Sequence, residues 1–224
     1  KTMLDDMETF LAKASRANAK TDSKKLGKLL GETTDRFNKI FELSGTLNPY
    51  IYSFVSTDSH NKEAKRIESE YEQIAVKANI LNTKFQAWTG TLGKSAIKKA
   101  AKVNASAQAH LFALNEAAEQ SKYLMSEAEE ILAAELTLSG GNAFGKLQGT
   151  VTSQMSVDFE LDGKTQKMPM PALINLRSHP DEATRKRGYE AENKAWESVQ
   201  ETLAACMNGV KGETLTLDKK RGRE

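Results

Sequence analysis

The stretch that decides the fold is LGKLLGETTDRFNKIFELSGTLNPYIYSF, residues 26–54. Its stripe residues recur every three or four positions, with a gap at Ser44; they are Leu26, Leu30, Thr33, Phe37, Ile40, Leu47, Ile51 and Phe54. This spacing is typical of one face of an α-helix, so it predicts a long helix near 24–56 that buries the stripe against another helix. Pro49 lies inside the pattern. Because the apolar phase continues past it, we expect a kink there and not a helix end.

A second stripe follows in IESEYEQIAVKANILNTKFQAWTGTL, residues 67–92. It keeps the same spacing without a gap through Ile67, Tyr71, Ile74, Ala78, Leu81, Phe85, Trp88 and Leu92. The polar cluster at 56–61 separates the two stripes and is typical of a turn. These segments therefore predict two long antiparallel helices, near 24–56 and 61–90, with Trp88 in the core between them.

Shorter helical patterns flank this hairpin. Leu4 is already in phase with Met7 and Leu11, so a helix is expected from the first residues. After Gly90 and Gly93 the pattern weakens, and we interpret 94–104 as a connection. Further helices are expected around Leu111–Ser121, over 127–138, over 144–151 and from about 180 to 207. Two regions follow, 1–104 as the long helical hairpin and 105–224 as a second helical domain.

Two local signals in the second half are stronger than periodicity. Ser126 followed by Glu129 is a capping box that begins a helix. Val157, Phe159 and Leu161 alternate with acids, and Asp162-Gly163 then precedes a second short run, which predicts a β-hairpin near 156–168. The fold class is therefore mainly α, with a long antiparallel helical hairpin, further helices and one small β-hairpin.

Composition excludes several classes of protein. The 224 residues carry 32 Lys and Arg against 30 Asp and Glu, and a net charge of +2 predicts no nucleic-acid partner. No apolar run approaches ~18 residues, so no membrane span is expected. The single cysteine, Cys206, cannot form an intramolecular disulfide, which favours a reducing compartment such as the cytoplasm.

For each candidate reactive residue a structural role is the better interpretation. The three histidines, His60, His110 and His179, are too far apart in sequence for the paired spacing of a helical zinc site. Cys206 is interpreted as a small apolar residue of a helix face. The sequence around Gly140-Gly141 lacks the lysine of a phosphate-binding loop, so a turn between helices is favoured. The lysines over 94–102 lack interleaved aromatics, which favours a solvated surface over a phosphate-binding one.

One region goes beyond these patterns. Residues 123–147 join a short acidic helix, the turn Ser139-Gly140-Gly141-Asn142, and a helix with Phe144-x-x-Leu147. This order resembles the oligoendopeptidase F family, relatives of thimet oligopeptidase and neurolysin. The family usually carries Trp where this chain has Phe144. The resemblance continues through 179–189 and 208–222, and more weakly at 50–58.

The resemblance implies a function for the parent protein. Members of the family are cytosolic zinc metallopeptidases that hydrolyse short peptides in a deep channel between two lobes. Their zinc site is a His-Glu-x-x-His helix plus a later glutamate, in which zinc-bound water is the nucleophile. No such motif occurs in this chain, so the resemblance places zinc in a C-terminal peptidase domain after Glu224.

We therefore expect the N-terminal, non-catalytic lobe, with no catalytic or metal residue within the chain and its substrate-binding residues unknown. Both ends are expected to be cuts in a longer protein; a genuine short protein is the alternative. A free-standing helical interaction module without enzymatic activity is the alternative function.

Overall fold

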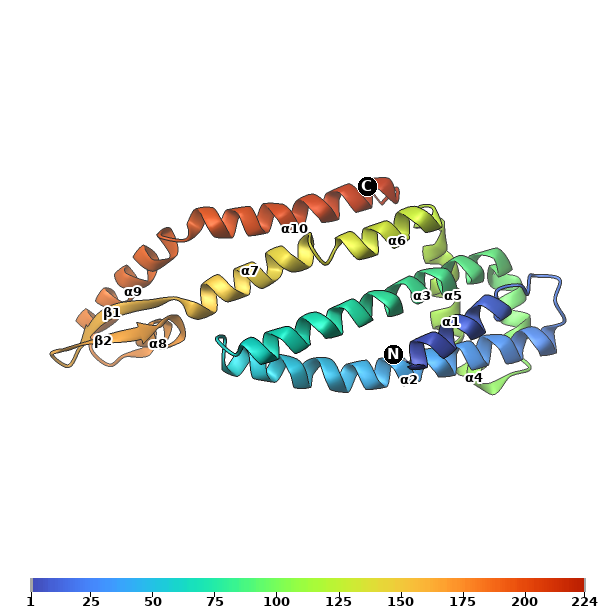
Figure 1. The fold of residues 1–224 in the computed structure, drawn as a ribbon, viewed down its shortest axis with the longest axis horizontal. Helices are drawn as coiled ribbons and strands as arrows, with labels where there is room; N and C mark the ends of the chain where they lie inside the picture. Colours follow the sequence, from blue (N-terminus) through green and yellow to red (C-terminus); the bar gives the residue numbers. More distant parts are fainter. Residues whose placement is uncertain (1, 224) are drawn as a thin grey trace. The chain divides into compact units, whose positions relative to one another are not determined.

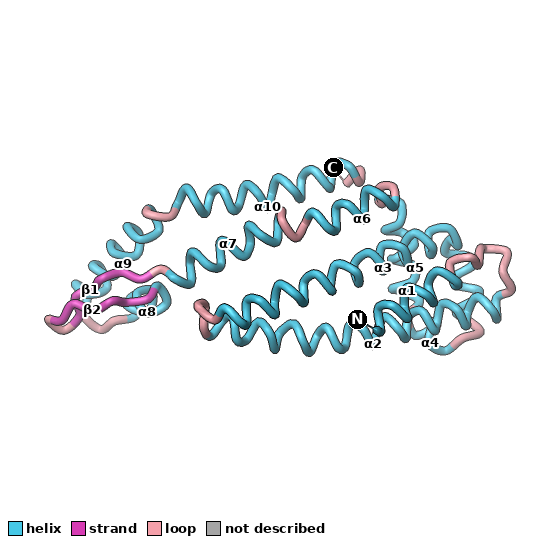
Figure 2. The backbone as a smooth tube through the Cα atoms, in the orientation of Figure 1, coloured by secondary structure: helices cyan, strands magenta, loops and turns pink. Residues whose placement is uncertain are grey.

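A computed structural model describes residues 2–223 (Figures 1 and 2). It is mainly helical with one two-stranded antiparallel sheet, which confirms the predicted fold class. The elements are α1 (Thr2–Ala14), α2 (Ser23–Thr57), α3 (Lys62–Ala101), α4 (Ala105–Ala109), α5 (Leu111–Gln120), η1 (Ser121–Tyr123), α6 (Glu127–Leu136), α7 (Gly141–Gln154), β1 (Ser156–Leu161), β2 (Lys164–Pro169), α8 (Met170–Asn175), η2 (Leu176–Ser178), α9 (Glu182–Glu197) and α10 (Gln200–Lys220).

The chain forms two compact units. The first contains the residues up to Val55, Lys62–Leu136 and the end of the chain from Leu217; the second contains Ser56–Asn61 and Thr137–Thr216. The boundary predicted at residue 104 lies between α3 and α4, inside the first unit. Among the described helices, none combines the length and the apolar character needed to cross a bilayer.

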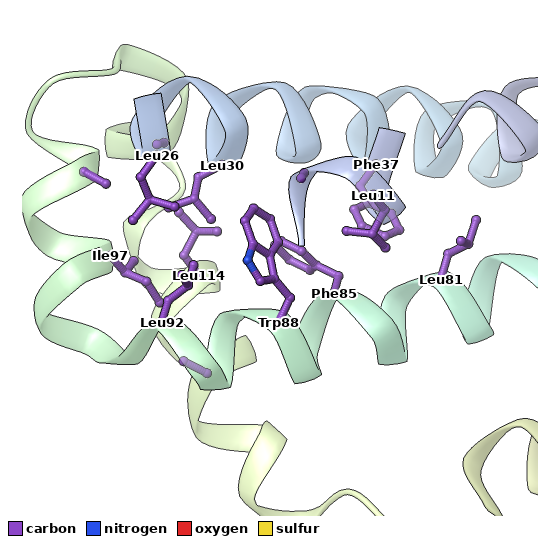
Figure 3. Packing of buried hydrophobic residues seen from close by; sticks show 14 of the residues in the cluster. Leu11, Leu26, Leu30, Phe37, Leu81, Phe85, Trp88, Leu92, Ile97 and Leu114 are labelled. Atoms are coloured by element: carbon purple, nitrogen blue, oxygen red, sulfur yellow. The ribbon is translucent and has the colours of Figure 1, made fainter. Parts of the chain in front are cut away.

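The first unit is built on the predicted helical hairpin. Helices α2 and α3 lie antiparallel, and Pro49 stays inside α2 without ending it. Figure 3 shows Phe85 and Trp88 pointing from α3 toward α2, with Leu11 of α1 between the two helices. The rings of Phe37 and Phe85 are 5.3 Å apart, and Trp88 is 3% exposed, so the predicted burial of Trp88 is confirmed.

The prediction that 94–104 is a connection is wrong. Gly93 leaves the helical conformation with φ 74° and ψ 153°, but the helix resumes and reaches Ala101. Ile97 is fully buried there. A Cβ on Gly27 of α2 would lie 2.4 Å from the carbonyl oxygen of Ala100, so small residues let the two backbones approach closely. The close contact between Gly27 and Ala100 could not be predicted from the spacing of apolar residues.

The stripes are only partly buried, contrary to the expectation that they pack along their whole length. Around Phe37 and Phe85 they form the core of the unit. Toward the hairpin turn several side chains are exposed: Leu47, Phe54, Ile67 and Ile74 of the stripes, and Phe41, Leu43, Tyr50 and Tyr52 beside them. Periodicity places residues on one face of a helix, but it does not say whether another element covers that face.

The second unit contains the predicted β-hairpin. Strands β1 and β2 pair antiparallel, with Leu161 opposite Lys164, and Asp162 and Gly163 have φ of 52° and 74°. Two successive residues with positive φ are typical of a type I′ turn. The apolar face of the hairpin is buried in a small core formed by Phe159, Met168, Met170, Leu173, Leu176 and Ala195.

The last predicted helix is two helices. Helix α9 ends at Glu197, and α10 then runs to Lys220, well past the expected end near Met207. The side chain of Asp181 caps α9 by accepting from the Thr184 amide at 2.8 Å.

Candidate functional site

The first unit contains a pocket of about 810 Å³ between α1, α3 and the segment from η1 to α6. Its apolar lining comes from Leu11, Leu81, Trp88, Leu124 and Met125, and its polar lining includes Glu8, Ser15, Thr83, Lys84, Thr91, Ser121, Glu127 and Glu130. This volume and this mixed chemistry are in the range of sites for small molecules and short peptides.

Trp88 belongs to both the core and the pocket. Its ring lies 6.2 Å from that of Phe85, and its Nε1 donates to the Ala17 carbonyl at 2.9 Å. The hydrogen bond satisfies the indole N–H and fixes the ring, as buried tryptophans require. Trp88 is therefore a rigidly held, buried side chain beneath the pocket lining.

A close approach of two backbone segments forms one side of the pocket. A Cβ on Gly90 of α3 would lie 2.0 Å from Ser121 Oγ in η1, so any larger residue here would force Ser121 to shift. Ser121 Oγ in turn donates to the Ala118 carbonyl at 2.8 Å. These contacts hold the start of the segment 121–130 against α3.

The capping box predicted at Ser126 places the next part of the lining. The Ser126 amide donates to Glu129 Oε2 at 3.0 Å, and the Glu129 amide lies 3.4 Å from Ser126 Oγ. Hydrogen bonding to Ser126 holds the pKa of Glu129 below its ordinary value. The box begins α6 so that Glu127 reaches Lys84 of α3 at 3.2 Å.

Glu130 is the most buried acid of the pocket, at 5% exposed. Arg221 Nε donates to its Oε1 at 3.0 Å and Arg221 Nη2 to its Oε2 at 2.6 Å. The Met125 amide also donates to Glu130 Oε1, at 3.1 Å. Hydrogen bonding from Arg221 is the main reason that the pKa of Glu130 is lowered. The carboxylate is therefore held as an anion and fixes the 124–130 segment.

The carboxylate of Glu213 binds the turn at Gly140-Gly141. Glu213 of α10 accepts from Thr137 Oγ1 at 2.6 Å and from the Gly141 amide at the start of α7. A carboxylate thus satisfies the N-terminus of α7, where anions are favoured. This arrangement agrees with the predicted turn between helices.

The three histidines lie in different places. His60 is exposed in the α2–α3 turn, His110 Nε2 is 3.1 Å from Asn38 Nδ2, and His179 Nδ1 accepts from the Asp181 amide at 3.2 Å. Cys206 is buried. Between Thr2 and Arg223, no three His, Cys, Asp or Glu side chains come together as a metal-binding group.

The sequence predicts no site here, although it places two of the lining residues, Leu81 and Trp88, on the core stripe of α3. The ion pair of Glu130 with Arg221 and the capping of α7 by Glu213 join residues more than 70 positions apart. The capping box at Ser126 is a second local signal next to the lining residues Met125 and Glu127. No family model, curated protein or solved structure matches this chain.

Proposed function

We propose that this chain is the N-terminal, non-catalytic lobe of a zinc oligopeptidase that resembles oligoendopeptidase F and hydrolyses short peptides. One observation carries the proposal. The region with the most specific resemblance, residues 123–222, supplies Leu124, Met125, Glu127 and Glu130 to the pocket. In this proposal the pocket is the part of the substrate channel wall that this lobe contributes.

The chemistry of the pocket supports a peptide as its occupant. Leu124 and Met125, which are half-buried in the pocket lining, offer apolar surface for a substrate side chain. Hydroxyls and the Lys84–Glu127 pair offer partners for backbone amides and for the charged ends of a short peptide. The combination favours binding and orientation of a peptide.

Zinc chemistry belongs to another part of the parent protein in this proposal. The described residues bring no group of three ligands together, so they do not fit a zinc site and no catalytic step is assigned to them. When bound, zinc would activate the attacking water in the peptidase domain. The proposal also assigns the protein to the cytoplasm, consistent with a lone, buried Cys206.

A free-standing helical interaction module is the second candidate. It is favoured by the exposed apolar side chains near the α2–α3 turn, such as Tyr50 at 64% and Tyr52 at 59% exposed. Exposed apolar patches of this kind mark interaction surfaces. In this alternative the pocket has no role in peptide cleavage.

The experiment uses the full-length product of the parent gene. Ala87 lines the pocket and is exposed on α3, so Ala87→Trp narrows the pocket without disturbing the core. We expect KM for an internally quenched peptide to rise about tenfold, roughly 1.4 kcal/mol of binding. The control Ala113→Trp changes an exposed alanine of α5 outside the pocket. Equal KM values for the two variants would show that the pocket is not part of the substrate channel.

A further inference from the structure

Three lysines of α3, all before its last turn, are paired with acids of other helices in the same unit. The pairs are Lys77 with Asp5 at 2.5 Å and Glu8 at 2.8 Å, Lys84 with Glu127 at 3.2 Å, and Lys94 with Glu119 at 2.6 Å. The acids come from α1, α6 and α5, respectively. These positive charges are therefore neutralised within the fold.

The pairing stops at the end of the helix. Lys98 and Lys99 of the last turn, and Lys102 just after it, are exposed, and no carboxylate of residues 2–223 lies within ion-pair distance of them. The sequence agrees, because no Asp or Glu occurs between Glu72 and Glu116. Three neighbouring positive charges are left without a counter-charge.

The start of α2 adds further positive charge beside these three. A second pocket, of about 190 Å³, is lined by Thr21, Ser23, Ser95 and Lys99, so the α1–α2 loop lies against the end of α3. Lys20, Lys24 and Lys25 are exposed on this loop and on the first turn of α2. We call the six lysines the basic surface: Lys20, Lys24, Lys25, Lys98, Lys99 and Lys102.

One acid lies within the basic surface, and it is already engaged. Asp22 Oδ1 accepts from the amides of Lys24 and Lys25, each at 3.1 Å, and so caps α2. Its charge is directed at the positive end of the helix dipole. The surface thus has six lysines against one acid, on a chain whose net charge is only +2.

We propose that the basic surface docks an acidic polypeptide segment. Complementary charge of this kind steers association and selects the partner. None of the residues that define the surface is aromatic, whereas surfaces that bind single-stranded nucleic acid commonly use stacking rings. The hydroxyls of Thr21, Ser23 and Ser95 can hydrogen-bond to carboxylates and to backbone groups of a peptide.

The inference is independent of the proposed peptidase function. None of the six lysines lines the 810 Å³ pocket. An acidic segment on the basic surface would therefore leave the pocket open. The docking test also needs no catalytic activity.

The probe is a fluorescein-labelled peptide of twelve residues that alternates Glu and Ser, followed by fluorescence anisotropy at low salt. The triple variant Lys98→Glu, Lys99→Glu, Lys102→Glu should bind it at least about tenfold more weakly. Binding should also weaken between about 0.05 and 0.3 M salt, as screening requires. A second triple variant, Lys98→Gln, Lys99→Gln, Lys102→Gln, should also bind the probe more weakly. Because glutamine is neutral, this variant separates the loss of positive charge from the repulsion that glutamate adds.

The matched control carries the same change of net charge elsewhere: Lys164→Glu, Lys167→Glu, Lys211→Glu, all exposed residues of the second unit. It should bind the probe like the unmodified chain. Circular dichroism checks that each variant is folded. An equal loss in the control, or tighter binding of a DNA duplex or of anionic vesicles than of the acidic peptide, would overturn the proposal.

Discussion

Arg221 and Glu130, 91 residues apart in the chain, form a two-pronged ion pair in which the carboxylate is 5% exposed. The pair ties the end of the chain to the first turn of α6, and Glu130 is part of the pocket lining. A buried charge left without its partner is strongly destabilising. The pair therefore makes the pocket wall depend on a residue distant in sequence.

Removing one partner should be costly. We expect Arg221→Met to lower the free energy of unfolding by about 2–3 kcal/mol, because Glu130 keeps its charge in a buried position. The double variant with Glu130→Gln should recover part of this loss. Urea melts of both single variants and the double variant measure the coupling. The exposed Lys28–Glu32 pair, 3.9 Å apart, is the control, and Lys28→Ala should cost less than about 0.5 kcal/mol.

The same pair predicts a pH dependence. The pKa of Glu130 is lowered in the fold from an ordinary value of 4.5, so folding favours its ionised form. This contribution to stability is complete above pH 4.5 and is lost as the pH falls below that value toward the folded pKa. The urea midpoint should therefore decline less steeply below about pH 4.5 in Glu130→Gln than in the unmodified chain. Parallel curves for the two proteins would show that Glu130 is not coupled to folding.

Among the core residues, Trp88 is the one whose truncation we expect to lower the free energy of unfolding most. Its truncation to alanine should leave a void beside Phe85 and cost about 3–5 kcal/mol. The helical pattern alone places Lys84 on the face of α3 opposite Trp88, where a substitution should hardly change stability. In the fold, however, Lys84 lines the pocket and pairs with Glu127. Lys98, which is exposed and has no ion pair among the described residues, is the better control, and Lys98→Ala should change stability by less than about 0.5 kcal/mol. Equal urea midpoints for the two variants would contradict the core position of Trp88.

Two glycines in long helices should respond in opposite directions to the same substitution. Gly90→Ala brings a Cβ to 2.0 Å from Ser121 Oγ, so we expect a loss of about 1–3 kcal/mol. Gly45→Ala meets no atom within 4 Å and should stabilise by up to about 1 kcal/mol. Thermal melts compare the two, and Ser121→Gly should rescue part of the Gly90→Ala loss. A Gly90→Ala protein as stable as Gly45→Ala would mean that η1 is not held against α3.

Local patterns predicted much of the fold. The stripe through Phe37, the capping box at Ser126 and the Asp162-Gly163 turn each depend on neighbours in sequence, and all three have the predicted structure. Glycine weakens helices, and Gly93 does interrupt α3, with φ 74° and ψ 153°. What the local pattern could not predict is that a second helical stretch follows to Ala101 and buries Ile97.

The pocket could not be predicted in the same way. Glu130 and Glu213 look like solvent-facing acids of ordinary helices, and only the fold brings Arg221 and the start of α7 to them. The exposed half of the stripes was missed for a related reason. Ile67 and Ile74 have the correct spacing for a core, but they are 39% and 43% exposed. Their exposure could not be predicted, because spacing carries no information about what covers a helix face.

The measurement that tests the central claim most directly is zinc-dependent cleavage of an internally quenched peptide by the full-length product of the parent gene. We expect cleavage that a chelator abolishes and added zinc restores, with a His-Glu-x-x-His segment encoded after Glu224. The chain of residues 1–224 alone should bind no stoichiometric zinc and cleave no peptide. A full-length protein that lacks this segment and leaves the peptide intact would contradict the peptidase account and favour the interaction module.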